Sequence, residues 1–188
     1  MTSLVLTVIG DDQAGLVDAL SGVIAEHGGN WQKSHMTQLA GKFAGIVLVT
    51  VADAKADDLV AALAPLEDRG LLDITVEVVA GADEAEGGES AQDEEDGATG
   101  SAARRSYSLH LVGQDRPGIV HDISQALAER GVSISDLVTA TNSAPMAGGL
   151  LFEAEATLDL PAQVSLEELR EALEALANEL MVDIDFST

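Results

Sequence analysis

Apolar residues recur along this 188-residue chain with two different periods. In residues 3–9 and 106–112 they occupy alternate positions, which is the pattern of a half-buried strand. In residues 16–24 and 119–127 they fall on one face of a helix. Further strands are predicted at 30–39, 43–51, 73–79, 132–141, 149–158 and 182–186. Leucines at helical spacing predict a second helix in each half, with its leucines at Leu59, Leu63 and Leu66 or at Leu166, Leu169, Leu173, Leu176 and Leu180.

The two halves of the chain are copies of one unit. Residues 8–31 align with residues 111–134 at a constant offset of 103 positions, which places Gly10 on Gly113 and Gly15 on Gly118. Each copy has the order β-α-β-β-α-β, which is typical of a ferredoxin-like domain. We therefore predict an α+β protein with two ferredoxin-like βαββαβ domains and antiparallel sheets, in residues 1–79 and 104–188.

Residues 80–103 separate the two copies. They are small and acidic and include no large apolar side chain, so they cannot bury enough surface to fold. They are predicted to form a flexible, charge-extended linker.

Turns and helix ends also have sequence signals. The turn before each first helix is predicted at 10–15 and 113–118, and Gly28 and Gly131 stand where a helix C-terminal glycine is expected. Ser165 and Glu168 fit a capping box at the start of the last helix. Asp53 is the predicted cap of the second helix in the first copy.

The helices are expected on one face of each sheet, which leaves the other face open. The strand periods place six side chains on the open faces: Val5, Thr7, Ile9, Ser108, His110 and Val112. Because these faces are partly apolar, we expect the two domains to pair with each other or with a second chain.

Charge and composition narrow the classes of function. The formal net charge is −24, with nine Lys and Arg in all, so direct binding of phosphate backbones is disfavoured. The chain has no cysteine, which excludes thiol catalysis, disulfides and thiolate metal sites. No signal peptide or membrane span is apparent, so a cytoplasmic protein that does not bind membranes is expected.

Two segments carry a family resemblance. GDDQAGLVDALSGVIAEHGGN and GQDRPGIVHDISQALAERGVS resemble the opening of ACT domains, small ferredoxin-like modules that bind amino acids. With KSHMTQLAGKFAGIVLV and APMAGGLLFEAEATLDLP, the tandem arrangement is similar to the glycine cleavage system transcriptional repressor group.

The resemblance implies an effector site at the turn before each first helix, where two such domains meet. There the helix N-terminus suits a carboxylate, and an acidic side chain suits an ammonium group. The ligand-binding residues it implies are Asp12, Gly15 and Asn30 in the first copy, and Asp115, Gly118 and Ser133 in the second. The aspartates could instead only cap their helices, and the glycines could only permit the turns.

The resemblance implies a non-enzymatic regulator that senses glycine or another small amino acid and acts through a protein partner, such as a DNA-binding regulator. A homodimer or pairing of the two domains within the chain is expected, with no catalytic residue, cofactor or metal, because the four histidines lack the spacing of a metal site. Two alternatives remain open: an adaptor with vacant sites, and a subunit that regulates a metabolic enzyme in trans.

Overall fold

The computed structural model describes residues 1–79, 105–143 and 149–187 of the chain. The predicted linker at residues 80–103 lies outside these ranges. So does most of the predicted turn between the second and third strands of the second copy.

Both halves contain the predicted order of elements. The first half contains β1 (Thr2–Asp11), α1 (Leu16–Glu26), β2 (Asn30–Leu39), β3 (Lys42–Val51), α2 (Ala56–Asp68) and β4 (Asp73–Val79). The second half contains β5 (Arg105–Gln114), α3 (Ile119–Ala128), β6 (Ser133–Ser143), β7 (Leu150–Leu160), α4 (Leu166–Leu180) and β8 (Val182–Ser187). The α+β class and the two ferredoxin-like units are thereby confirmed.

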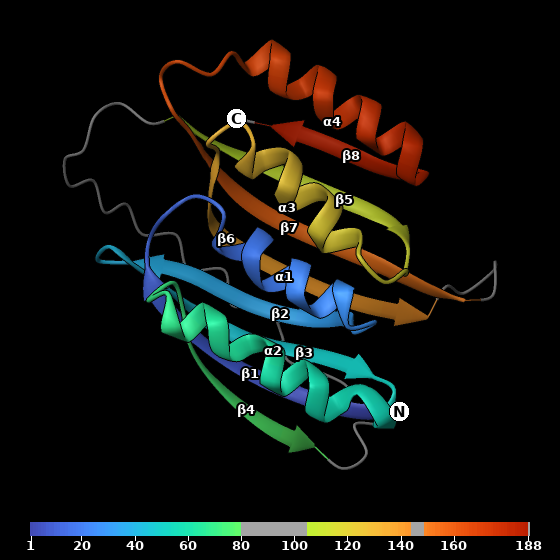
Figure 1. The fold of residues 1–188 in the computed structure, drawn as a ribbon. Coiled ribbons are helices and arrows are strands. Elements are labelled where there is room, and N and C mark those ends of the chain that lie inside the picture. The colour runs from blue at the N-terminus through green and yellow to red at the C-terminus, as the bar shows by residue number, and fades with distance from the viewer. Residues whose placement is uncertain (80–104, 144–148, 188) are drawn as a thin grey trace.

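The eight strands form a single sheet in the order β4-β1-β3-β2-β6-β7-β5-β8. The two halves join where β2 pairs antiparallel with β6, from Ser34 opposite Thr139 to Thr37 opposite Asp136. Figure 1 shows all four helices on one face of this sheet, with α1 and α3 side by side over the junction. The two domains thus pair within the chain, but through strand edges and first helices. The open sheet faces, which the sequence analysis expected to be covered, take no part in this pairing.

Strand alternation separates the two faces of the sheet as predicted. Leu4, Leu6 and Leu111 are fully buried beneath the helices. On the opposite face, 46% of the Ile9 side chain is exposed, and His110 is exposed as well. The core is therefore one continuous aliphatic layer between the sheet and the helices.

Gly10 and Gly113 lie in strands, not in the turns where the sequence analysis placed them. A Cβ at Gly10 would lie 2.3 Å from the carbonyl oxygen of Leu71, and one at Gly113 would lie 2.3 Å from a methyl carbon of Val182. Both copies therefore require glycine at this position, because the chain passes directly against it at Leu71, just before β4, and at Val182, the first residue of β8.

The helix ends agree with the sequence only in part. Gly28 and Gly131 adopt positive φ values of 71° and 69° as C-terminal glycines. Ser165 is the N-cap residue of α4, but its side chain makes no capping hydrogen bond, so the predicted capping box does not form.

Asp53 does not cap α2, whose N-cap residue is Lys55. Its carboxylate accepts hydrogen bonds from the N-terminal amine at 2.9 Å and from the Thr2 hydroxyl at 2.8 Å. These two donors lower the pKa of the Asp53 carboxyl because they stabilise its charged form.

Candidate functional site at the domain junction

The two domains are related by an approximate two-fold axis through the middle of the sheet. On this axis, residues that are equivalent in the sequence repeat face each other. His35 of β2 is opposite Val138 of β6, and the hydroxyls of Ser21 in α1 and Ser124 in α3 lie 3.0 Å apart in the interior. Each domain therefore presents the same surface to the other, although the side chains differ.

Asp18 and His121 form a third pair of equivalent residues on the axis. A carboxylate oxygen of Asp18 lies 3.1 Å from the imidazole Nδ1 of His121, and the two side chains are 29% and 31% exposed. In a dimer of identical domains, this place would hold two copies of the same residue. The duplication has allowed an acid and a base to face each other.

The first helix of each domain begins at the junction with a glycine as its N-cap residue. Gly15 and Gly118 have φ values of 92° and 87°, a left-handed conformation that favours glycine. A Cβ on Gly15 would lie 3.8 Å from that of Ala128, and one on Gly118 would lie 4.0 Å from that of Ala25. Each uncapped helix start therefore lies against the first helix of the other domain. Its N–H groups and positive dipole end suit an anion.

One pocket lies between the start of α3 and the start of β2, and we call it the Gly118 pocket. Its lining includes Ser21, Ala25, Gly29, Asn30, Gly118 and His121. The pocket thus combines the helix N-terminus of the second domain with the first strand residues after α1 in the first domain.

Asn30 and Asp115 connect the two domains beside this pocket. Nδ2 of Asn30 donates a hydrogen bond of 2.8 Å to Oδ2 of Asp115. The remaining oxygen of each side chain, Oδ1, is buried and has no hydrogen-bond partner among the described residues. Buried polar atoms are normally hydrogen-bonded, so two such acceptors near a helix N-terminus can receive a donor such as an ammonium group.

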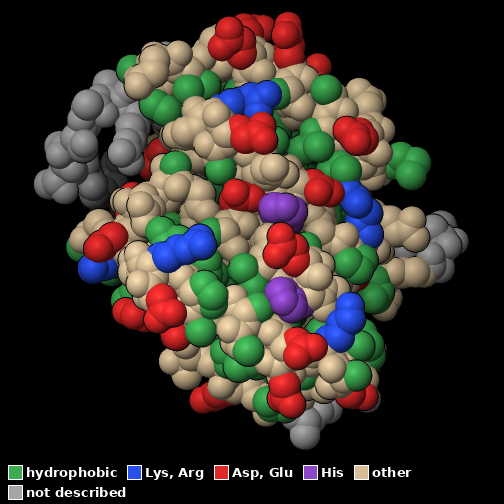
Figure 2. Space-filling view, in the orientation of Figure 1, with side chains coloured by type: hydrophobic (Ala, Val, Ile, Leu, Met, Phe, Trp, Pro, Cys, Tyr) green, Lys and Arg blue, Asp and Glu red, His purple; other side chains and the backbone are tan. Residues whose placement is uncertain are grey.

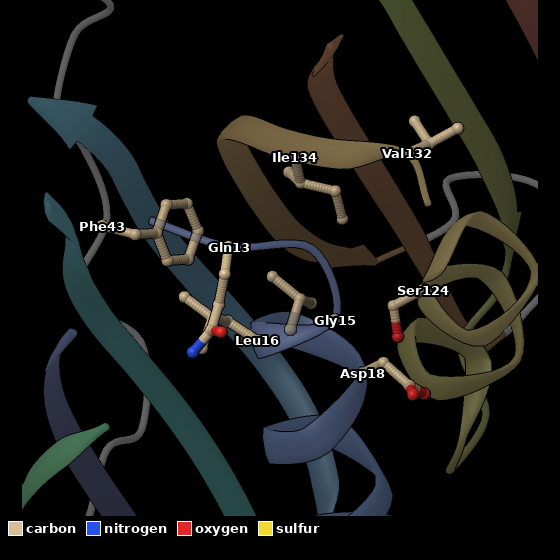
Figure 3. Close-up of a pocket in the computed structure, with 9 residues that line it drawn as sticks. Gln13, Gly15, Leu16, Asp18, Phe43, Ser124, Val132 and Ile134 are labelled. Carbon is tan, nitrogen blue, oxygen red and sulfur yellow. The ribbon is translucent and has the colours of Figure 1, made fainter. Parts of the chain in front are cut away.

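The equivalent pocket between the start of α1 and the start of β6 is called the Gly15 pocket. Figure 3 shows it, with Phe43 and Gln13 on one side and Ser124, Val132 and Ile134 on the other. The polar side chains in its lining are Gln13, Asp18 and Ser124, whereas Ser133, the equivalent of Asn30, is not part of the lining.

The structure brings the sequence-predicted residues together across the domains. Gly118 and Asn30 line one pocket, with Asp115 bonded to Asn30. Gly15 lines the other pocket.

Two further predicted residues lie outside both linings. The carboxylate of Asp12 accepts a hydrogen bond of 2.9 Å from Nε2 of Gln38 in its own domain. Ser133 is buried, with 8% of its surface exposed. Asp12 and Asp115 do not cap the first helices, since the N-cap residues are Gly15 and Gly118.

Sequence reasoning missed Asp18 and His121, which belong to the two pockets. Their numbers differ by the repeat offset, as do those of Ser21 and Ser124. A search for equivalent positions on the exposed side of the two first helices could have identified them, but only after α1 and α3 were known to pack together.

Both pockets are small. Each has a cavity volume of about 10 Å³, which is room for about one water molecule. An amino acid can therefore enter only if the two domains move relative to each other or if the lining side chains turn away.

Other surfaces of the described residues differ from the junction. Figure 2 shows many acidic and few basic side chains over the helix-covered face. A depression of about 530 Å³ on the open face of the sheet is lined by residues including His110, Glu155 and Asp185. No group of potential ligands that could hold a metal ion is found in the described ranges. Within the same ranges, no helix has both the length and the hydropathy to cross a membrane.

A sequence model of the ACT domain matches the chain twice, over residues 2–78 and 109–187. A curated relative, a UPF0237 protein of Methanopyrus kandleri, is 43% identical over 54 residues, which are 29% of this chain and 60% of the relative. The chain thus spans less than two thirds of the length of that relative.

Three solved structures are similar to the chain to different degrees. An unknown protein from Galdieria sulphuraria is 30% identical, with a TM-score of 0.44 and coverage of 99% of this chain and 97% of the other. A candidate glycine cleavage system transcriptional repressor is 16% identical, with a TM-score of 0.42 and coverage of 99% and 96%. The aspartate kinase of Synechocystis is 14% identical, with a TM-score of 0.53 and coverage of 93% and 26%.

Proposed function

The chain belongs to the ACT domain family, and from that premise we propose that it is a regulatory protein that binds a small amino acid where its two domains meet. In this proposal it catalyses no reaction of its own. It uses no cofactor, and it reports the bound effector to a protein partner.

The Gly118 pocket carries the proposal. The free acceptors on Asn30 and Asp115 suit an α-ammonium group, and the uncapped start of α3 suits an α-carboxylate. Amino acids carry both charges a short distance apart, so one ligand satisfies both ends of the pocket. The Gly15 pocket, with Asp12 and Ser133 nearby in sequence, is a second and weaker site in this proposal.

The closed state of the pocket supports a regulatory role and a small effector, such as glycine. Because the cavity holds about one water molecule, binding requires the junction to open. A ligand that binds the open arrangement better shifts the population toward it, and that shift changes the surface available to a partner. A DNA-binding regulator fits as the partner, since a chain of net charge −24 is itself unsuited to DNA.

Calorimetric titration of the full chain with each of the twenty amino acids tests the proposal. We expect a small amino acid to bind, and we expect Asn30→Ala to weaken that binding. If none of the twenty binds at millimolar concentration, the proposed function is wrong.

The small size of both pockets also favours a second candidate function, an adaptor whose sites stay vacant. Pull-down of partners with and without added amino acids distinguishes the two functions. A sensor gains or loses its partner when the effector is added, whereas an adaptor binds its partner equally in both conditions.

A further inference from the structure

Three buried polar side chains meet where β2 and β6 join the two domains. Nε1 of Trp31 donates a hydrogen bond of 3.2 Å to Oγ1 of Thr139, and Oγ of Ser34 lies 3.0 Å from the same oxygen. Trp31 and Ser34 are each 3% exposed and Thr139 is 1% exposed. One hydroxyl of the second domain thus satisfies two polar groups of the first, in a place that water does not reach.

The repeat shows what would occupy these places if two identical domains paired instead. The offset of 103 residues makes Met36 the equivalent of Thr139, whereas Ile134 and Leu137 are the equivalents of Trp31 and Ser34. The strand register is consistent with this, since Ser34 is opposite Thr139 and Met36 is opposite Leu137.

Two first domains that paired in this register would each place Trp31 and Ser34 against Met36. The indole N–H and the serine hydroxyl would then be buried without a partner, twice in each assembly. Two second domains would place Thr139 against Ile134 and Leu137, which would leave its hydroxyl unpaired. Buried polar groups without partners are strongly unfavourable, and buried polar residues of this kind set pairing specificity in other assemblies.

We propose that the Trp31–Thr139–Ser34 cluster restricts the junction surface of each domain to one partner, which is the other type of domain. A second copy of the same domain is excluded by the polar groups that it would leave unsatisfied. This inference concerns the pairing of domains and holds whether or not an amino acid binds at the junction.

Asp18 and His121, which face each other across the axis, also disfavour the pairing of identical domains. Pairing of two first domains would place Asp18 against Asp18, and pairing of two second domains would place His121 against His121. The carboxylate and imidazole that now lie 3.1 Å apart would each face a like group. Two Asp18 carboxylates at such a distance repel each other, although partial exposure weakens the effect.

The absence of cysteine from the sequence allows a direct test on the full chain. His35 and Val138 face each other on the axis, so each would face its own copy if identical domains paired. His35→Cys reports pairing of two first domains as a disulfide-linked dimer. Val138→Cys reports pairing of two second domains in the same way. A chain that carries both substitutions should form a disulfide within one chain, which shows that the native register persists.

Each cysteine reporter is then combined with two sets of substitutions, which distinguish the pairing of two first domains from the pairing of two second domains. Thr139→Val removes the group that would be orphaned between second domains, whereas Trp31→Phe with Ser34→Ala removes those that would be orphaned between first domains. Relief of one unpaired buried group predicts about a fivefold change in population. Thr139→Val also removes the partner of Trp31 and Ser34 in the native junction, which favours both reporters equally. In this background we therefore expect the disulfide-linked dimer from Val138→Cys to increase at least about fivefold more than the dimer from His35→Cys. In the Trp31→Phe/Ser34→Ala background, where Thr139 loses its partners, we expect the reverse, with the dimer from His35→Cys increasing at least about fivefold more than the dimer from Val138→Cys.

Thr75→Cys, an exposed position on the edge strand β4, measures collisional cross-linking in each background. The proposal is supported if each reporter exceeds the collisional level and increases most in the background that removes its own unpaired groups. Equal increases from both reporters in both backgrounds would show general loosening and overturn it, and so would no increase in either. Formation of the intrachain disulfide in each background confirms that the variants are folded.

Discussion

Asn30 and Asp115 are joined by a hydrogen bond of 2.8 Å between the two domains, although 85 residues separate them in sequence. In the other half of the junction, the residue equivalent to Asp115 is Asp12, which accepts a hydrogen bond from Gln38 in its own domain. The two copies therefore have the same fold, but the equivalent aspartates have different partners: Asp115 bonds to the other domain and Asp12 to its own. That difference distinguishes the two pockets chemically.

The first prediction concerns Asp115. Asp115→Ala removes a charged acceptor from the proposed ammonium site, and hydrogen bonds to charged groups contribute about 1.5–3 kcal/mol. We expect the dissociation constant of the amino acid that binds to rise by about tenfold or more, measured by calorimetry.

Two further variants, Asp57→Ala and Asp12→Ala, serve as comparisons for Asp115→Ala. Asp57→Ala removes an exposed carboxylate in the first turn of α2, away from both pockets, and should leave affinity unchanged. Asp12→Ala should cause a smaller loss than Asp115→Ala. If the losses are equal, the Gly118 pocket is not the stronger site.

The second prediction contrasts two glycines, Gly10 and Gly118, each of which has a glycine at the equivalent position of the other copy. Gly118→Ala meets no clash, because its Cβ would lie 4.0 Å from the nearest atom, but it must adopt a φ of 87°. Such a conformation costs about 1–2 kcal/mol for a residue with a side chain. Gly10→Ala would place its Cβ 2.3 Å from a backbone oxygen and should reduce the free energy of unfolding more. Chemical denaturation of both variants measures the difference, and a larger loss from Gly118→Ala would contradict this reasoning.

The fold could be predicted because its signals are local and repeated. Alternation in residues 3–9, the helical stripe in residues 16–24 and Gly28 at a helix end each depend on near neighbours in sequence. The offset between copies then extends every assignment from one half to the other. Gly10 was misplaced in a turn because the need for glycine there comes from close contact with Leu71. That residue lies far along the chain, just before the edge strand β4.

The junction could be predicted only in outline. The resemblance implied that ligand residues lie where two domains meet, but no pattern in the sequence shows which strand edges pair. The bond from Asn30 to Asp115 depends on how β2 and β6 align, and so does that from Trp31 to Thr139. Residues that act across an interface carry no spacing signal, because the spacing is set by packing of the domains.

The third prediction concerns the contribution of Asp18 and His121 to the junction. A double-mutant cycle of Asp18→Asn and His121→Gln isolates the interaction between the two side chains. Since both are about 30% exposed, we expect a coupling of at most about 1 kcal/mol. Chemical denaturation at low and high salt measures it, and the coupling should fall as salt rises. A coupling that is unaffected by salt would mean that the pair is not electrostatic.

The fourth prediction follows from the net charge of −24. Repulsion among like charges destabilises a compact chain, and raising the ionic strength from 0.1 M to 1 M shortens the screening length from about 10 Å to about 3 Å. We therefore expect the midpoint of thermal unfolding to rise with potassium chloride over this range.

A variant with fewer carboxylates shows whether charge is the cause. Glu155 on β7 and Asp183 and Asp185 on β8 are exposed on the open face, on either side of β5, where they add to the repulsion among like charges. Glu155→Gln/Asp183→Asn/Asp185→Asn should raise the midpoint at low salt and reduce its further increase with salt. If the midpoint of the unmodified chain does not rise with salt, the acidic surface does not limit its stability. In that case the core and the junction set the stability of the chain.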